Sequence, residues 1–312
     1  MAEFVIIPDS SSDLSKNLRE RFHIPAYVKG TFYFPDGTES RSDLDWELMD
    51  PKTYYESMSG RKVLYKTASA QRGDIFEVYE QFLKEGKDIL AITLSSALSG
   101  TNQVCHKVAE ELLEKYPERK IVVLDSLRYS TALSLLVAMA SKKQQEGATL
   151  EETAAYVEAN KHRIHQMGPM DDMFFLVKTG RVSNFKAFFG TLIGINPMAD
   201  FNRQGLSQVL GKFKGKKKAF DAVIEYMRGT IENPEEQIIF VAHSNREKAA
   251  QVLAQRIRET FNPKEIIINH VGMSCGASIG PGLCAAFYQG KEISEGLVEE
   301  QALMNSIIEK QK

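Results

Sequence analysis

Short β-branched runs alternate with longer stretches of helical periodicity through the first half of the chain, and this alternation constrains the fold most. The apolar runs lie at residues 4–7, 89–94 and 121–124, and the helical stretches that follow them lie at 14–22, 102–116 and 129–146. Such a rhythm is typical of βαβ units, in which helices connect the strands of a parallel sheet. The run 121–124 is apolar at every position, as expected for a strand that helices cover on both faces. We therefore expect a three-layer α/β/α N-terminal domain.

The second half has a different texture and predicts a second α/β domain. A helical stretch at 150–165 is followed by a glycine-rich region that extends to Pro197. Apolar runs then indicate strands, helical periodicity indicates helices, and residues 202–205 indicate a hairpin turn. The strands are expected at 195–201, 206–213, 237–242 and 265–270, and the helices at 217–232 and 246–261. We place the boundary near residue 163, which gives an N-terminal domain of 1–163 and a two-layer C-terminal domain of 164–312 with a mixed sheet.

Charge and composition exclude several classes of protein. The 312 residues carry 39 Lys and Arg against 41 Asp and Glu, a net charge of −2, which argues against a chain built to coat nucleic acid. No window has the 18 apolar residues of a membrane span, and the acidic start with its short apolar run is unlike a secretory signal. We expect a cytoplasmic protein without a membrane span or nucleic-acid partner; transient contact with a membrane surface is left open.

The three cysteines are predicted to be buried, reduced and inert. They are Cys105, Cys275 and Cys284, and no two of them form a CxxC pair. An odd number without metal-ligand spacing favours free thiols in a reducing compartment. No metal site is expected from them.

Polar residues follow the three predicted parallel strands, at 9–13, 93–96 and 125–126. Ligands of open α/β sheets bind at the carboxyl ends of strands, so we expect these segments to share one crevice. Asp9 and Asp13 in the first segment could hold Mg²⁺, but Asp13 directly precedes a helix, and this position favours a capping role.

The strongest local feature is the loop that contains Ser95, Ser96, Ser99 and Gly100, between a strand and a helix. Hydroxyls and free N–H groups at a helix N-terminus form a ready anion site. The alternative is structural: Ser99 caps the helix and Gly100 makes a tight turn. The loop by itself does not separate these interpretations.

Two further residues are candidates for an anionic ligand. Thr67 lies on the polar approach to a helix that begins near 73–74, where a turn or capping role is the alternative. Arg181 stands among small residues and could face a carboxylate or phosphate, or form an ordinary surface ion pair.

Three other motifs give weaker signals. The glycine-rich segment 271–282 could let the backbone approach a ligand, but it lacks the Lys and Ser or Thr of a phosphate loop. His243 follows a predicted strand but has no hydrolase motif around it. The lysines between 212 and 218 are predicted to form a solvated turn.

Taken together, these segments resemble the DegV family, bacterial fatty-acid-binding proteins that serve as the lipid-carrying subunit of fatty acid kinase. The resemblance covers nearly the whole chain. It rests on blocks in the family's order, at 9–14, 66–74, 94–101, 125–130, 180–183, 212–219, 242–244 and 276–282.

The resemblance implies a non-catalytic carrier. One long-chain fatty acid would lie in an apolar tunnel, with no further cofactor and with Thr67 and Ser99 binding its carboxylate beside backbone N–H groups. Arg181 would lie near the mouth, where the head group meets a separate kinase subunit. The N-terminal domain would supply the serine-rich head-group loops and the C-terminal domain the tunnel, whose shape depends on residues such as Phe188, Phe189, Leu192, Ile193 and Met273.

The chain departs from the family's pattern at several positions. Ser278 replaces a usual His and can donate a hydrogen bond, but it cannot become cationic. Further departures are Thr179, Asn196, Ala132, Ser134 and the segment 68–70. We expect a divergent member with a carboxylate site at Thr67, Ser99 and Ser278. Two rivals stay open: a serine hydrolase of lipid esters or thioesters that uses a serine of 95–99, and a binder of phosphate compounds.

Overall fold

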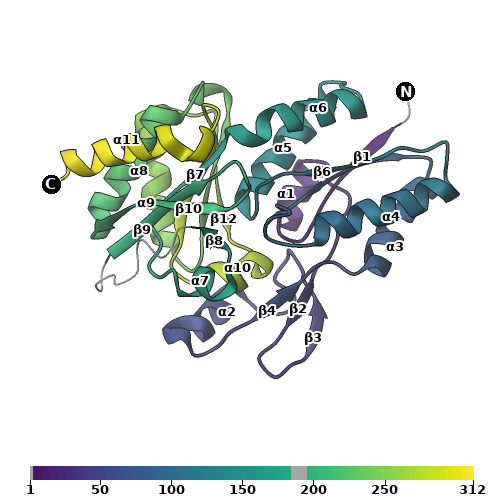
Figure 1. The fold of residues 1–312 in the computed structure, drawn as a ribbon, viewed down its shortest axis with the longest axis horizontal. Coiled ribbons are helices and arrows are strands. Elements are labelled where there is room, and N and C mark those ends of the chain that lie inside the picture. Colours follow the sequence, from purple (N-terminus) through teal and green to yellow (C-terminus); the bar gives the residue numbers. More distant parts are fainter. Residues whose placement is uncertain (1–2, 184–194) are drawn as a thin grey trace. The chain divides into compact units, whose positions relative to one another are not determined.

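The computed structural model describes residues 3–183 and 195–312 (Figure 1). The chain divides into two compact units. Unit 1 comprises Met1–Leu48, Leu64–Lys161 and Gly272–Cys275, and unit 2 comprises Met49–Val63, His162–Val271 and Gly276–Lys312. The main change of unit therefore falls beside the expected position at residue 163. The chain also changes unit around 49–63 and 272–275, which the single expected boundary does not describe.

Unit 1 is built on a parallel sheet of three strands, β1 (Phe4–Pro8), β5 (Asp88–Thr93) and β6 (Ile121–Asp125), in the order β1-β5-β6. Both pairings are parallel, which confirms the predicted βαβ arrangement. Every residue of the central strand β5 is buried, and the residues between its polar ends Asp88 and Thr93 are all apolar, as expected for a strand that helices cover on both faces.

Helices cover both faces of this sheet. One face packs against α3 (Arg72–Lys84) and α4 (Thr101–Lys115) through a core that includes Ile75, Val108 and Leu112. The helices α5 (Thr131–Gln145) and α6 (Leu150–Asn160) also contact the strands, and α1 (Lys16–Arg21) follows β1. Thr149 and Glu152 form a capping box at the start of α6, which explains why that helix begins there.

A small antiparallel sheet in unit 1 was not anticipated from the sequence. Its order is β3 (Glu39–Arg41), β2 (Thr31–Tyr33) and β4 (Lys66–Ala68). Phe32 of β2 is fully buried, and its ring stacks on Tyr65 with 5.3 Å between centroids. Strands of three residues give too short a pattern for period-two alternation to stand out.

Unit 2 contains the mixed sheets that the sequence predicted. One has the order β12 (Glu265–His270), β11 (Ile238–His243), β13 (Cys284–Gln289) and β7 (Ile164–Met167). The β11–β12 pair is parallel, and the other two pairs are antiparallel. The second sheet has the order β8 (Val182–Ser183), β10 (Ser207–Lys214) and β9 (Ile195–Phe201). β9 and β10 form the predicted hairpin around residues 202–205.

The helices of unit 2 are α2 (Pro51–Met58), α7 (Phe174–Thr179), α8 (Lys216–Thr230), α9 (Glu247–Phe261) and α11 (Val298–Lys310); α10 (Met273–Ile279) begins in unit 1 and ends in unit 2. No described helix has the length and apolar character needed to cross a bilayer. The three cysteines are free and buried, as predicted.

A fully buried polar pair links several elements of unit 2. His165 Nδ1 lies 2.6 Å from Asp200 Oδ2, and His165 Nε2 lies 2.9 Å from the carbonyl oxygen of Lys291. Because that carbonyl can only accept, Nε2 carries a proton. Asp200 also accepts from the Tyr226 hydroxyl at 2.8 Å and from the Gln166 N–H at 2.9 Å. The pair thus ties β7 and β9 to α8.

Candidate functional site

The polar segments that follow the three parallel strands meet at the carboxyl edge of the unit 1 sheet. Asp9 Oδ2 accepts the Leu94 N–H at 2.7 Å, which joins the segment after β1 to the loop after β5. The Asp125 carboxylate accepts the Ser96 N–H at 3.2 Å and the Leu127 N–H at 2.9 Å. This gathering follows from the topology, because parallel strands place their carboxyl ends at one edge.

The loop after β5 presents one hydroxyl to neighbouring hydroxyls. Ser99 Oγ lies 3.2 Å from Ser69 Oγ and 3.0 Å from Thr101 Oγ1, and the Ala70 N–H donates to Thr101 Oγ1 at 3.3 Å. We call Ser69, Ser99 and Thr101 the hydroxyl cluster. Its members are neutral donors and acceptors at the start of α4, a combination suited to a carboxylate or another small anion.

Sequence reasoning missed Ser69, although a signal for it was present. Ser69 stands two residues after Thr67, and positions i and i+2 of an extended segment share a face. Thr67 lies on β4 opposite Phe32 and is half-buried. Its hydroxyl has no hydrogen-bond partner within the described part of the chain, so it can bind a ligand without losing a protein contact.

The other predicted residues of this loop have distinct surroundings. Ser95 is fully buried, and its hydroxyl accepts the Ala97 N–H at 3.3 Å, which is a turn-forming contact. Ser96 is exposed. Gly100, rather than Ser99, is the N-cap residue of α4, while Ser99 Oγ still accepts the Thr101 N–H at 3.3 Å. A Cβ at Gly100 would come within 3.2 Å of Ser69 Oγ, so glycine leaves room for the hydroxyl cluster.

The two aspartates near β1 bind protein groups rather than capping α1. Asp13 has a φ of 53°, and its carboxylate accepts from Ser130, from Thr131 at 3.2 Å and from the Gly272 N–H at 2.9 Å. The expected cap was wrong, because Ser15 precedes α1 and Asp13 instead binds the start of α5. Burial raises the pKa of Asp9 to about 6 and that of Asp13 to about 7.

The remaining predicted site residues, Ser278 and Arg181, belong to unit 2. Ser278 lies on α10 and is half-buried. Arg181 follows Gly180, the left-handed residue that ends α7, and its guanidinium donates to the carbonyl oxygen of Thr179. The roles of all seven predicted residues stay predictions. Of the residues named for the tunnel, Phe188, Phe189, Leu192 and Ile193 lie outside the described residues, and Met273 is buried.

The glycine-rich segment near the end serves packing within unit 2. Gly280 has a φ of 73° and Gly282 a φ of 107°, where a side chain is strained. A Cβ at Gly280 would lie 2.1 Å from the Phe175 ring, and one at Gly282 would lie 2.6 Å from the Asp171 side chain. The glycines therefore admit neighbouring side chains of the protein.

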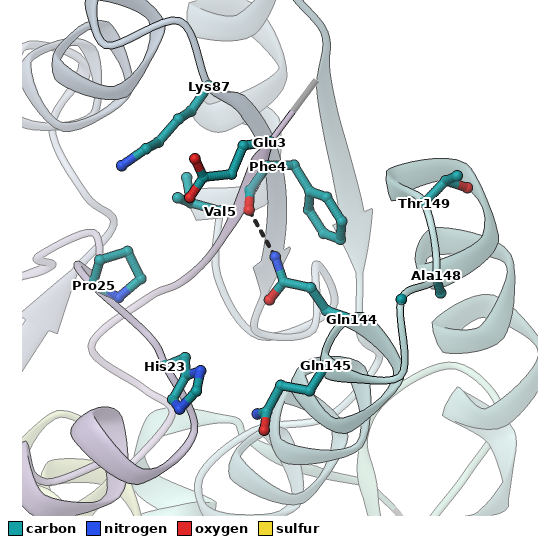
Figure 2. A pocket seen from close by; sticks show the side chains of 11 residues that line it. Glu3, Phe4, Val5, His23, Pro25, Lys87, Gln144, Gln145, Ala148 and Thr149 are labelled. Carbon is teal, nitrogen blue, oxygen red and sulfur yellow. Dashed lines mark hydrogen bonds between the residues drawn. The ribbon is translucent and has the colours of Figure 1, made fainter. Parts of the chain in front are cut away.

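A cavity of about 500 Å³ lies at the opposite, amino-terminal edge of the unit 1 sheet (Figure 2). Its walls include Phe4, Lys87, His23 and Gln145, and Gln144 Nε2 donates to the Phe4 carbonyl oxygen at 2.7 Å. None of the predicted site residues lines it. The cavity is therefore separate from the hydroxyl cluster.

Three comparisons with known proteins agree with one another. The family model described as "Uncharacterised protein, DegV family" matches residues 3–291. A DegV domain-containing protein of Clostridium perfringens is 34% identical over 290 residues, which are 93% of this chain and 98% of that protein.

Solved structures of DegV family proteins also match the chain. A DegV family protein of Thermus thermophilus, described by its fatty acid binding, matches with a TM-score of 0.81 and 25% identity over 92% of this chain and 99% of that one. A DegV lipid-binding protein of Thermotoga maritima matches with a TM-score of 0.79 and 24% identity over 93% of this chain and 99% of that one. At 24% identity, the likeness to the Thermotoga maritima protein shows the fold alone.

Proposed function

Since the chain belongs to the DegV family, we propose that it binds one long-chain fatty acid and presents the carboxylate to a separate kinase. In this proposal the kinase carries out the ATP chemistry in the cytoplasm, and the present chain is a carrier without catalytic residues. The Thermus thermophilus relative, described by its fatty acid binding, supports the choice of ligand.

The hydroxyl cluster is the observation on which the proposal rests. A carboxylate that leaves water needs hydrogen-bond donors, or its burial costs several kcal/mol. The Ser69 and Thr101 hydroxyls each lie within 3.2 Å of the Ser99 hydroxyl, and Thr67 on β4 offers an unengaged one. Hydrogen bonds to a charged acceptor are about twice as strong as those between neutral groups. These neutral donors therefore suit a carboxylate.

The affinity would come from the acyl chain rather than from the head group. Each buried methylene contributes about 0.8 kcal/mol, so a chain of about sixteen carbons offers on the order of 10 kcal/mol before ordering costs. Head-group contacts would then orient the lipid. This division predicts that head-group variants weaken retention without abolishing it.

The kinase step can be tested at Ser278, which stands where the family usually has a histidine. A serine hydroxyl can bind a carboxylate, but it cannot supply the positive charge of an imidazolium. We expect the chain to bind fatty acid and to support acyl-phosphate formation slowly when a fatty acid kinase subunit and ATP are added. Ser278→His should accelerate that step, since an imidazole keeps a hydrogen-bond donor at this position and can also carry a positive charge.

The first measurement is mass spectrometry of the purified chain under native and denaturing conditions. We expect a fatty acid at about one per chain. The double variant Thr67→Ala with Ser99→Ala should lose lipid at least about tenfold faster, which corresponds to about 1.4 kcal/mol. Thr38→Ala, an exposed turn residue of unit 1, is the matched control. Unchanged retention in the double variant would remove these residues from the head-group site.

The hydrolase rival has its own outcome in this series. Among the described residues, no histidine forms a hydrogen bond with Ser95, Ser96 or Ser99, although a serine nucleophile needs such a base. Covalent labelling by a fluorophosphonate that disappears in one Ser→Ala variant would nevertheless replace the carrier proposal. Stabilisation by phosphate compounds but not by fatty acids would favour the phosphate binder.

A further inference from the structure

Two histidines and a glutamate meet at the carboxyl end of the β11–β12 pair in unit 2. His243 ends β11 and His270 ends β12, and the two are register partners in the parallel ladder. Glu247 is the first residue of α9, which follows β11. We call these three residues the His–Glu–His cluster. The topology alone brings them together, because parallel strands end at the same edge.

The distances within the cluster approach those of a tetrahedral metal site. Glu247 Oε2 lies 3.3 Å from His243 Nε2 and 4.0 Å from His270 Nε2, and one ligand atom from each residue lies within 4.8 Å of the others. Zinc bonds of about 2.0–2.1 Å at tetrahedral angles separate ligand atoms by roughly 3.3–3.4 Å. We propose that the His–Glu–His cluster binds a divalent transition metal ion of the zinc type, with its fourth position open to water.

One side chain of the His–Glu–His cluster is buried and the other two are exposed. The His243 side chain is 1% exposed, whereas the side chains of His270 and Glu247 are 40% and 56% exposed. An ion can therefore reach the site from solvent, and the two exposed ligands can move the short distance that closes the tetrahedron. Imidazole and carboxylate together form a ligand set that zinc uses widely.

The electrostatic surroundings keep the imidazoles able to bind a metal. Burial lowers the pKa of His243 to about 4, with a further contribution from His270, and burial also lowers the pKa of His270. Burial thus disfavours the charged form of both rings, and a neutral imidazole retains the lone pair that a metal ion needs. The guanidinium of Arg246, the residue before Glu247, forms an ion pair with Asp171.

A hydrogen bond between His243 and the backbone of Arg246 limits the affinity of the His–Glu–His cluster for a metal ion. His243 Nδ1 accepts the Arg246 N–H at 3.2 Å, so in the metal-free protein the ring proton lies on Nε2 and faces Glu247. A metal ion would displace that proton, and Nδ1 would take up a proton and give up the Arg246 contact. Dedicated metal sites place an acceptor beside that nitrogen instead. We therefore expect binding in the micromolar range, weaker than at a dedicated structural site.

Cobalt reports this coordination directly. The full chain, freed of metal by a chelator, is titrated with Co²⁺ and followed by the visible absorption of the tetrahedral ion and by calorimetry. We expect about one ion per chain, displacement of Co²⁺ by Zn²⁺ and a higher melting temperature with Zn²⁺. Glu247→Gln and His270→Ala should each weaken binding at least tenfold; both alter exposed side chains and should fold.

Two variants serve as controls. His106→Ala removes an exposed histidine from α4, and Glu259→Gln removes an exposed carboxylate from α9, the helix that carries Glu247. Both should bind Co²⁺ like the unmodified chain. The proposal is overturned if the unmodified chain gives no tetrahedral band, or if Glu247→Gln and His270→Ala bind the ion as tightly as the controls do.

Discussion

At the scale of single residues, the clearest feature of the described chain is a buried pair of polar side chains whose hydrogen bonds are satisfied within the protein. His165 and Asp200 are completely buried, yet every polar atom of the pair has a partner. In the hydroxyl cluster, the Ser99 hydroxyl lies within hydrogen-bond distance of the Ser69 and Thr101 hydroxyls. Polar residues in these positions restrict the chain to one arrangement, because an unpaired buried polar group costs about 1–3 kcal/mol.

The buried pair gives the first prediction. Asp200→Ala should lower the free energy of unfolding by about 3–5 kcal/mol, because it leaves His165 and the Tyr226 hydroxyl without their buried acceptor. Asp200→Asn should lose less, since the amide can still hydrogen-bond with the ring. Urea unfolding at pH 7 measures both. An Ala variant within about 1 kcal/mol of the parent would show that the pair contributes little.

Asp13 gives a prediction about pH. Burial raises its pKa from 3.8 to about 7, so between these values the folded chain binds a proton that the unfolded chain does not. The contribution of Asp13 to stability is therefore fully present below about pH 4 and is lost as pH rises to about 7. Each pKa unit corresponds to about 1.4 kcal/mol.

Comparison with Asp13→Asn isolates this residue, because asparagine does not titrate. Unfolding free energies measured by urea between pH 4 and pH 7 should fall more steeply for the parent than for the variant. Parallel pH profiles would contradict the raised pKa. Asp9 titrates in the same range and its charge raises the pKa of Asp13, so the difference between the two profiles reports Asp13 together with its interaction with Asp9.

At the scale of elements, the long patterns were predictable and the short ones were not. The three parallel strands of unit 1, the β9–β10 hairpin and the helices α3, α4, α5, α8 and α9 follow the periodicities expected for them. The strands β2, β3 and β4 have three residues each. Tertiary pairing rather than local pattern decides such short strands, because a three-residue run cannot show a period.

The candidate site was partly predictable for a related reason. The carboxyl-edge rule located the loop of Ser99 from strand order alone. Ser69 instead directly follows β4, a short strand that the sequence did not predict. Gly280 and Gly282 were interpreted as room for a ligand. Their neighbours, Phe175 and Asp171, come from a segment more than 100 residues earlier, which no local rule can indicate.

Gly282 provides the prediction at this scale. Gly282→Ala should destabilise the chain by about 2–4 kcal/mol, since it adds backbone strain at a φ of 107° and a Cβ within 2.6 Å of Asp171. Gly37→Ala is the matched control, because Gly37 has a φ of 88° and a Cβ added there would meet no atom within 4 Å. It should lose only about 1–2 kcal/mol. Equal losses in the two variants would refute the packing contribution.

At the scale of the whole molecule, neither unit is a continuous piece of chain. Unit 1 includes Gly272–Cys275, and the Gly272 N–H completes the hydrogen bonds of Asp13. Ser274 Oγ also lies 3.2 Å from Ser10 Oγ. A boundary drawn from sequence texture at residue 163 cannot include such a late segment, because its four residues show no periodicity of their own.

This organisation predicts how a fragment behaves. A chain cut to residues 1–163 lacks 272–275 and retains 49–63, which belongs to unit 2. We expect broad, weakly cooperative thermal unfolding and binding of a hydrophobic dye, measured against the full chain. A sharp transition near that of the full chain would show that the late segment is dispensable to unit 1.

The short segment 272–275 also sets an order of events during synthesis. A ribosome releases the N-terminus first, so the strands and helices of unit 1 leave the exit tunnel long before Gly272 does. Until then Asp13 lacks one of its hydrogen-bond donors, and the nascent unit is exposed to proteases and chaperones in an incomplete form. A chain truncated before Gly272 would therefore leave Asp13 without this donor permanently.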